Sequence, residues 1–157
     1  MLLKGIIQED FLQYKKPSLF LIFPYCTWKC DKEAKARICP NSQLAASPAV
    51  NIPAKYIVEL YLKNDISKAV VCGGLEPFES FDDLYELIEL LRERTNDDVV
   101  IYTGFYEEEI QDKIDKLKKF DNIIVKFGRY IPGQERHFDP VLGIELASDN
   151  QFAVKIS

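Results

Sequence analysis

The sequence predicts an α/β fold in which a mostly parallel sheet forms an open, partial (β/α) barrel. Four short apolar runs have the character of buried strands, and stretches of helical periodicity lie between them: residues 18–23 (SLFLIF), 69–72 (AVVC), 99–102 (VVIY) and 122–126 (NIIVK). Apolar strands that alternate with helices are typical of a parallel sheet covered by helices. Four to five strands are too few for a closed eight-stranded barrel, so we expect an open one.

Three helices are expected between these strands. Pro53 occupies a favoured first helical position, and Ser80 with Asp83 resembles a capping box. The third helix, over residues 107–119, begins with glutamates and ends with lysines, which suits the helix dipole. The apolar residues expected on the buried faces are Ile57, Leu60 and Tyr61, then Leu84, Leu87, Ile88 and Leu91, then Ile110, Ile114 and Leu117.

The C-terminal part is expected to contain no further helix. Residues 128–140 have no helical period, and two short strand-like runs follow at 141–146 and 152–156. The chain shows no internal repeat and no low-complexity linker, so residues 1–157 are interpreted as a single domain.

The composition excludes several classes of protein. No apolar run approaches the roughly 18 residues of a membrane span, and residues 1–17 do not resemble a signal peptide. We therefore expect a cytoplasmic protein without a membrane partner, in which thiols stay reduced. A net charge of −5 and a pI near 5.0 argue against a nucleic-acid surface. The lysines of residues 113–119 are interpreted as a solvated helix face.

Three cysteines, Cys26, Cys30 and Cys39, follow the first predicted strand directly. Thiolates bind both iron–sulfur clusters and zinc, so a metal site is the first hypothesis. A cubane cluster needs only these three ligands and keeps one iron open, whereas structural zinc needs a fourth, from Cys72, His137 or a carboxylate. Three unrelated thiols remain the simplest alternative. Cys72 lies within an apolar run and is expected in the core, and His137 is expected at the surface.

Two further loops are expected beside the cysteines. Gly73-Gly74 ends the second predicted strand, and Thr103-Gly104 ends the third. In parallel α/β folds the chemistry lies at the carboxyl ends of the strands. The order of elements therefore predicts that all three loops converge on one edge of the sheet, where glycine lets the backbone approach a small ligand.

These motifs resemble the radical S-adenosylmethionine superfamily, and within it the small activating proteins of anaerobic ribonucleotide reductase. The resemblance covers most of the chain, through the following segments: Cys26-x3-Cys30, Cys39-Pro40-Asn41, Gly73-Gly74-Leu75-Glu76-Pro77-Phe78, Ile101-Tyr102-Thr103-Gly104-Phe105 and Leu146-Ala147-Ser148-Asp149-Asn150-Gln151. The first two motif types are shared across the superfamily, and the last two are similar to the activating proteins.

The resemblance implies a cofactor set and a reaction. Cys26, Cys30 and Cys39 would bind a [4Fe-4S] cluster whose open iron is chelated by S-adenosylmethionine. Other contacts to this cofactor would come from the two loops: Gly73, Gly74, Glu76, Pro77 and Thr103. Reductive cleavage of the sulfonium would yield a 5′-deoxyadenosyl radical that abstracts hydrogen from a glycine of the partner, and no side chain is assigned a catalytic role.

The resemblance also implies two partners. One is a large glycyl-radical enzyme, anaerobic ribonucleotide reductase. The other is a low-potential electron donor such as flavodoxin or ferredoxin.

The chain departs from the superfamily pattern at three places. The usual spacing is Cys-x3-Cys-x2-Cys, but here eight residues, 31–38, separate the second and third cysteines, and Glu33 stands at the expected third position. Such an insertion costs little free energy, since each doubling of loop length adds roughly 0.6 kcal/mol of loop-closure entropy. Ile38 replaces an aromatic residue, and Lys126-Phe127-Gly128 lacks an aspartate before the glycine.

Two other functions compete with the activating enzyme. The cysteine loop of a non-catalytic scaffold protein would bind zinc or a cluster only for folding. Alternatively, the same radical chemistry would act on another substrate, although a chain of 157 residues is short for enclosing a small molecule.

Overall fold

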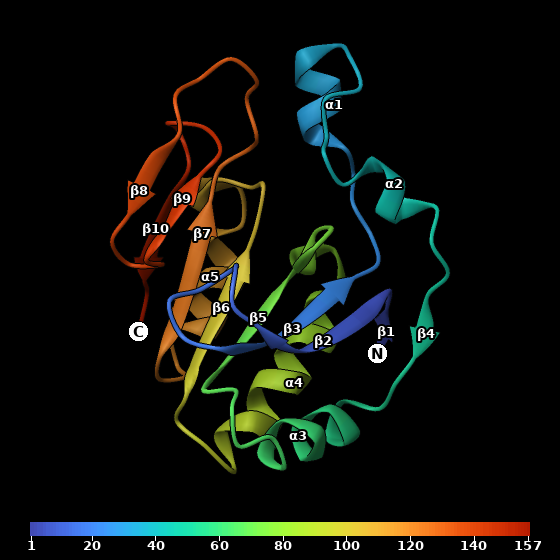
Figure 1. Ribbon diagram of the computed structural model, residues 1–157, viewed down its shortest axis with the longest axis vertical. Helices are drawn as coiled ribbons and strands as arrows, with labels where there is room; N and C mark the ends of the chain where they lie inside the picture. The colour runs from blue at the N-terminus through green and yellow to red at the C-terminus, as the bar shows by residue number, and fades with distance from the viewer.

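A computed structural model describes residues 1–157 and confirms the expected α/β architecture (Figure 1). Its six-stranded sheet has the order β10-β7-β6-β5-β3-β2. The four inner strands are parallel: β3 (Ser18–Phe23), β5 (Ala69–Gly74), β6 (Asp98–Tyr102) and β7 (Ile123–Phe127). Antiparallel strands flank them, β2 (Gly5–Asp10) and β10 (Phe152–Lys155). The sheet does not close on itself, as expected for a partial barrel.

One face of the sheet is covered by helices, and the main core lies there. These are α3 (Ala54–Leu62), α4 (Phe81–Arg92) and α5 (Gln111–Leu117), with short 3-10 turns η1 (Pro77–Ser80) and η2 (Glu107–Glu109) before the last two. Most of the predicted apolar stripes are buried here, including Leu84, Leu87, Ile88 and Leu91. Ser80 precedes α4 as predicted, but its side chain makes no capping hydrogen bond.

The other face of the sheet carries a smaller hydrophobic core. Tyr14, Leu142 and Leu146 pack there against β5, β6 and β7. Leu146 belongs to a separate two-stranded sheet of β8 (His137–Asp139) and β9 (Ile144–Leu146). The predicted strand at 141–146 was therefore too long, because residues 140–143 form the turn between β8 and β9. His137 lies in β8 and is partly buried, not in a surface loop as expected.

Some elements were not predicted. β2 was not predicted because it is an edge strand that carries polar residues, and it therefore lacks the apolar run of the inner strands. β1 (Leu2–Leu3) and β4 (Val50–Asn51) form a two-residue ladder. α1 (Lys29–Ala34), in the loop that carries the three cysteines (residues 24–41), and α2 (Ser42–Ala45), directly after that loop, are too short to show a helical period. No helix has the length and apolar character needed to span a membrane.

The parallel register brings the carboxyl ends of the inner strands to one edge. Phe23, the last residue of β3, pairs with Gly74 of β5, and Tyr102 of β6 pairs with Lys126 of β7. The cysteine loop and the turns after β5 and β6 all leave from this edge, and α1 lies beyond it (Figure 1). The predicted convergence of the three loops is confirmed.

Candidate functional site

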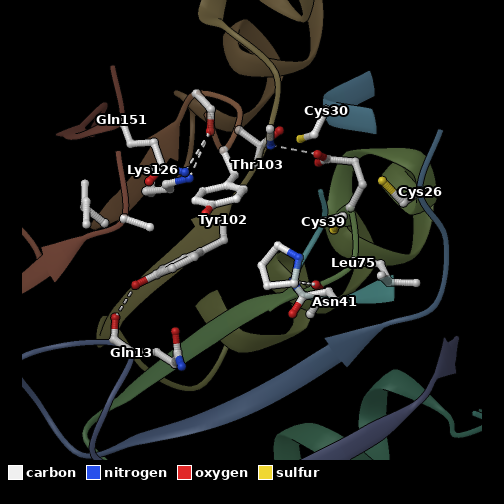
Figure 2. A pocket seen from close by; sticks show the side chains of 18 of the residues that line it. Gln13, Cys26, Cys30, Cys39, Asn41, Leu75, Tyr102, Thr103, Lys126 and Gln151 are labelled. Atoms are coloured by element: carbon white, nitrogen blue, oxygen red, sulfur yellow. Dashed lines mark hydrogen bonds between the residues drawn. The ribbon is translucent and has the colours of Figure 1, made fainter. Parts of the chain in front are cut away.

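A cavity of about 420 Å³ opens at this edge of the sheet. Its walls contain six of the residues predicted to form the site: Cys26, Cys30, Cys39, Gly74, Glu76 and Thr103. Figure 2 shows the three cysteines and Thr103 around it. Gly73 and Pro77 do not line it. Both are buried, Gly73 beneath the Phe20 ring and Pro77 at the start of η1.

The first two cysteines are positioned by the local backbone before α1. Trp28 adopts the left-handed conformation with φ 59°, and its N–H donates to Cys26 Sγ over 3.3 Å. α1 then begins at Lys29, so Cys30 lies in its first turn. Burial raises the pKa of the Cys26 thiol to about 11, despite the hydrogen bond from Trp28, which lowers it.

The third cysteine is positioned by Asp31. This carboxylate accepts hydrogen bonds from Ile38 N and Cys39 N through the same oxygen, Oδ1, each over 2.9 Å. Lys35, which follows the last residue of α1, adopts the left-handed conformation with φ 51° and turns the chain back toward Asp31. Asp31, the first of the eight residues between Cys30 and Cys39, thus holds the two ends of this insertion together. Cys39 therefore reaches the same cavity as Cys30.

Glu33 does not point into the cavity as a ligand in place of the missing cysteine. Its carboxylate forms an ion pair with Nε of buried Arg129, at 3.0 Å. A second carboxylate, Glu109 of η2, bonds both Arg129 and Lys29. Through these four side chains α1 is tied to η2 and to the chain after β7. The insertion is therefore packed against the domain.

The motif of residues 148–151 holds the segment after β7, which contains Gly128 and Arg129. Asn150 Nδ2 donates to the carbonyl of Arg129 over 2.9 Å, and Gln151 Nε2 donates to the carbonyl of Gly128 over 3.3 Å. Gly128 has φ +103°, and a Cβ there would lie 3.0 Å from the Asn150 carbonyl oxygen. The motif thus fixes the backbone that presents Arg129 and Lys126.

The glycine turn is shaped by the neighbouring strand. Gly74 has φ +83°, and a Cβ on it would lie 2.5 Å from Ile22 Cγ2 of β3. Its carbonyl accepts a hydrogen bond from Asn41 Nδ2 over 2.8 Å, which ties the turn to the end of the cysteine loop. Packing alone therefore accounts for glycine at this position, without a ligand.

Glu76 is a buried carboxylate in the cavity wall. It accepts hydrogen bonds from Gly104 N over 2.9 Å and Phe78 N over 3.2 Å. Burial raises its pKa to about 7, although these bonds and one from Thr103 lower it. Near neutral pH this group is able to accept a hydrogen bond from a cationic ligand.

Several cavity residues were not assigned to the site by sequence reasoning, although Tyr102 and Gln151 lie within the quoted motifs: Gln13, Tyr102, Lys126, Arg136 and Gln151. Lys126 is the most unusual, because an ammonium group ends an apolar strand and is 7% exposed. Burial lowers its pKa to about 8. Its charge within the run NIIVK was the one available signal, since lysine is almost never buried without a reason.

The zinc alternative loses two of its three candidate fourth ligands, Cys72 and His137, and keeps only a carboxylate, for which Glu76 lies in the same cavity. No group of three His, Cys, Asp or Glu side chains lies close enough to bind one metal ion. Cys72 is fully buried on the helix-covered face, as predicted for a core residue, and neither it nor His137 lines the cavity. Cysteines of a cubane cluster each bind a different iron, so they are spaced more widely than the ligands of a single ion.

The Gly74 analysis gives a stability prediction. We expect Gly74→Ala to lower the free energy of unfolding by about 2–4 kcal/mol, from the positive φ and the clash with Ile22. Gly104→Ala is the matched control, since its Cβ would meet no atom closer than 3.7 Å; it should change stability by less than about 0.5 kcal/mol. Denaturant unfolding of both variants checks this, and equal stabilities would contradict it.

Comparison with known proteins agrees with the cysteine geometry. No curated protein and no solved structure matched the chain. The family model described as a 4Fe-4S single cluster domain matches residues 18–149, which include all three cavity cysteines and every loop at the carboxyl edge. The chain therefore belongs to the 4Fe-4S single cluster domain family and is an iron–sulfur protein.

Proposed function

We propose that this protein is a radical S-adenosylmethionine enzyme that installs a glycyl radical on a large partner, anaerobic ribonucleotide reductase. One observation carries the proposal: three thiols from a single loop share one cavity with a glycine turn and a buried carboxylate. The family match supports the cluster. The radical chemistry and the partner rest on the motifs described above.

The donor set fits a cluster with one open iron. Cys26, Cys30 and Cys39 line the cavity, and the fourth cysteine faces the opposite side of the sheet. Three protein ligands leave one iron of a cubane free for an exogenous ligand. Held by these three cysteines, a reduced cluster would supply the one electron that cleaves a carbon–sulfur bond of the sulfonium to methionine and a 5′-deoxyadenosyl radical.

The rest of the cavity suits an amino-acid and nucleoside ligand. Glu76 is positioned to accept hydrogen bonds from the methionyl ammonium group, and the backbone N–H of Gly104 and the side chain of Thr103 hold Glu76 in place. Apolar side chains make up much of the remaining wall and limit the access of water: Phe20, Ile22, Leu44, Leu75, Ile144 and Leu146. Exclusion of water protects a reactive radical from side reactions.

The open edge of the sheet suits a protein substrate. The strands form a partial barrel, and the segment that carries α1 lies across from the β8–β9 sheet (Figure 1). Residues of both segments line the cavity. A loop of a partner protein would enter here and bring its glycine Cα to the ligand. Hydrogen abstraction from that carbon yields 5′-deoxyadenosine and a glycyl radical. The electron would come from a low-potential donor such as flavodoxin or ferredoxin.

The ligand assignment gives an iron-binding prediction. After anaerobic reconstitution we expect about four irons per chain, and a severe loss of iron in Cys26→Ala, Cys30→Ala and Cys39→Ala. Cys72→Ala is the matched control and should keep its iron, since Cys72 lies in the core. Iron and sulfide analysis with visible absorbance checks this. Equal losses in Cys72→Ala and Cys30→Ala would refute the assignment.

The loop closure by Asp31 gives a second prediction. Asp31→Ala removes the acceptor of two backbone N–H groups beside Cys39, so the cluster should load poorly and be lost faster to a chelator. Asp31→Asn keeps a side-chain oxygen and should retain most of the iron. If Asp31→Ala binds and retains iron as the unaltered protein does, Asp31 does not position Cys39.

The reaction itself is tested with the partner. With a strong low-potential reductant, S-adenosylmethionine and the reductase, we expect equal amounts of methionine and 5′-deoxyadenosine and a glycyl radical signal in electron paramagnetic resonance. Cys39→Ala should give none of these. A cluster-loaded protein that binds S-adenosylmethionine but never cleaves it, with the partner present, would favour the non-catalytic scaffold.

A further inference from the structure

The cysteine loop carries three cations that have no ionic partner within the chain. Lys32, Lys35 and Arg37 are exposed, and none of them takes part in an ion pair. The two carboxylates of the loop are already engaged. Asp31 accepts hydrogen bonds from two backbone N–H groups, and Glu33 pairs with a buried arginine. The exposed surface of the loop is therefore positive, although the whole chain has a net charge of −5.

The other lysine-rich stretch of the chain, residues 113–119, differs in this respect. Each of its four lysines lies over an aromatic ring or pairs with a carboxylate of the chain. Of the two segments, the cysteine loop is thus the one that leaves its cations available to another molecule. Exposed charges attract an oppositely charged protein and raise its rate of association, over a Debye length of roughly 10 Å at 0.1 M ionic strength.

A hollow of about 350 Å³ lies on the same loop. Four residues line it, none of which lines the main cavity: Trp28, Asp31, Arg37 and Ser42. Two of them contact the predicted cluster ligands. The N–H of Trp28 donates to Cys26 Sγ over 3.3 Å, and Asp31 Oδ1 accepts from Cys39 N over 2.9 Å. A molecule bound at this hollow would lie next to two of the ligands and leave the main cavity free.

We propose that Lys32, Lys35 and Arg37, together with the hollow beside Trp28, form the docking surface for a small acidic protein that carries one electron. One electron passes from this carrier to the cluster, so the carrier is oxidised by one electron, the cluster is reduced by one, and no atom is transferred. The use made of that electron rests on the proposed function, whereas the transfer itself needs only the cluster. A protein substrate fits this surface less well, because its reacting residue must enter the main cavity, which shares no lining residue with the hollow.

The surface variant is Lys32→Gln/Lys35→Gln/Arg37→Gln, made in the full, reconstituted protein. Stopped-flow absorbance follows reduction of the cluster by reduced flavodoxin and, separately, by reduced ferredoxin, both acidic carriers. At low ionic strength we expect the second-order rate constant to fall about tenfold or more, and the affinity for the oxidised carrier, measured by calorimetry, to fall with it. Both losses should shrink as salt is added. Photoreduced deazaflavin, a small uncharged reductant, should reduce the variant and the unaltered protein at equal rates.

The matched control is Lys55→Gln/Lys63→Gln/Lys68→Gln. It removes the same amount of charge from exposed, unpaired lysines that lie on or just after α3 and just before β5, at the opposite end of the sheet from α1 (Figure 1). Its rate constant and affinity should stay within about twofold of those of the unaltered protein. Iron is measured in every sample. If the surface variant loads less iron, Lys32→Gln and Arg37→Gln are compared singly, each with an expected slowing of about two- to fivefold.

The outcomes distinguish this surface from the proposed function. If the carrier reduces the cluster through these cations but the protein never cleaves S-adenosylmethionine, the surface stands and the proposed function is refuted. Equal carrier kinetics and affinity in the surface and control variants would overturn the surface, even in a protein that cleaves S-adenosylmethionine with deazaflavin as reductant. Weaker binding of the reductase with unchanged carrier kinetics would also overturn it, because the cations would then bind the protein substrate.

Discussion

The parallel pairing of β3 with β5 determines where the cysteine loop and the glycine turn meet. Ile22 pairs with Gly73, and Phe23 with Gly74, so the chain enters the cysteine loop beside the turn that follows β5. Ile22 leaves space only for glycine at position 74. Asn41 then bonds the Gly74 carbonyl from the far end of the loop. Both ends of the cysteine loop are thus held at one turn.

Charged side chains allow this loop to be longer than the usual pattern. Asp31 closes the insertion by binding the N–H of Cys39. Glu33 and Lys29 hold α1 against Arg129 and Glu109. Ion pairs at a surface contribute little, but Arg129 is buried and donates to carboxylates of two elements. Its removal would leave Glu33 without a partner and Glu109 with Lys29 alone. The altered spacing and a three-thiol cavity are therefore compatible.

Sequence reasoning succeeded where a local pattern reports directly on structure. Apolar runs located β3, β5, β6 and β7, and the leucine stripe of α4 is buried as its period indicates. The convergence of the loops followed from strand order alone. The sequence located Gly74 at the end of a strand, but it did not show why glycine is needed there. The atom that excludes a Cβ belongs to Ile22, more than 50 residues earlier in the chain.

What sequence reasoning missed depends on contacts through space. Arg129 meets Glu33 and Glu109 only after three elements have packed, so no spacing in the chain indicates the network. In the sequence, Lys126 is the polar last residue of an apolar run. In the structure, side chains alternate between the two faces of β7, and that of Lys126 points into the cavity. Two of the residues at which the chain departs from the radical S-adenosylmethionine pattern have roles in the structure: Glu33 packs the cysteine loop against Arg129, and Lys126 lines the cavity.

The central claim is that three cysteines hold a cluster whose open iron meets S-adenosylmethionine in this cavity. Electron paramagnetic resonance of the reduced, reconstituted protein tests it most directly, recorded before and after S-adenosylmethionine is added. We expect a [4Fe-4S]⁺ signal whose g values change on addition, because a new ligand binds at an iron. A cluster signal that stays identical at saturating S-adenosylmethionine, or the absence of any [4Fe-4S]⁺ signal, would contradict the account.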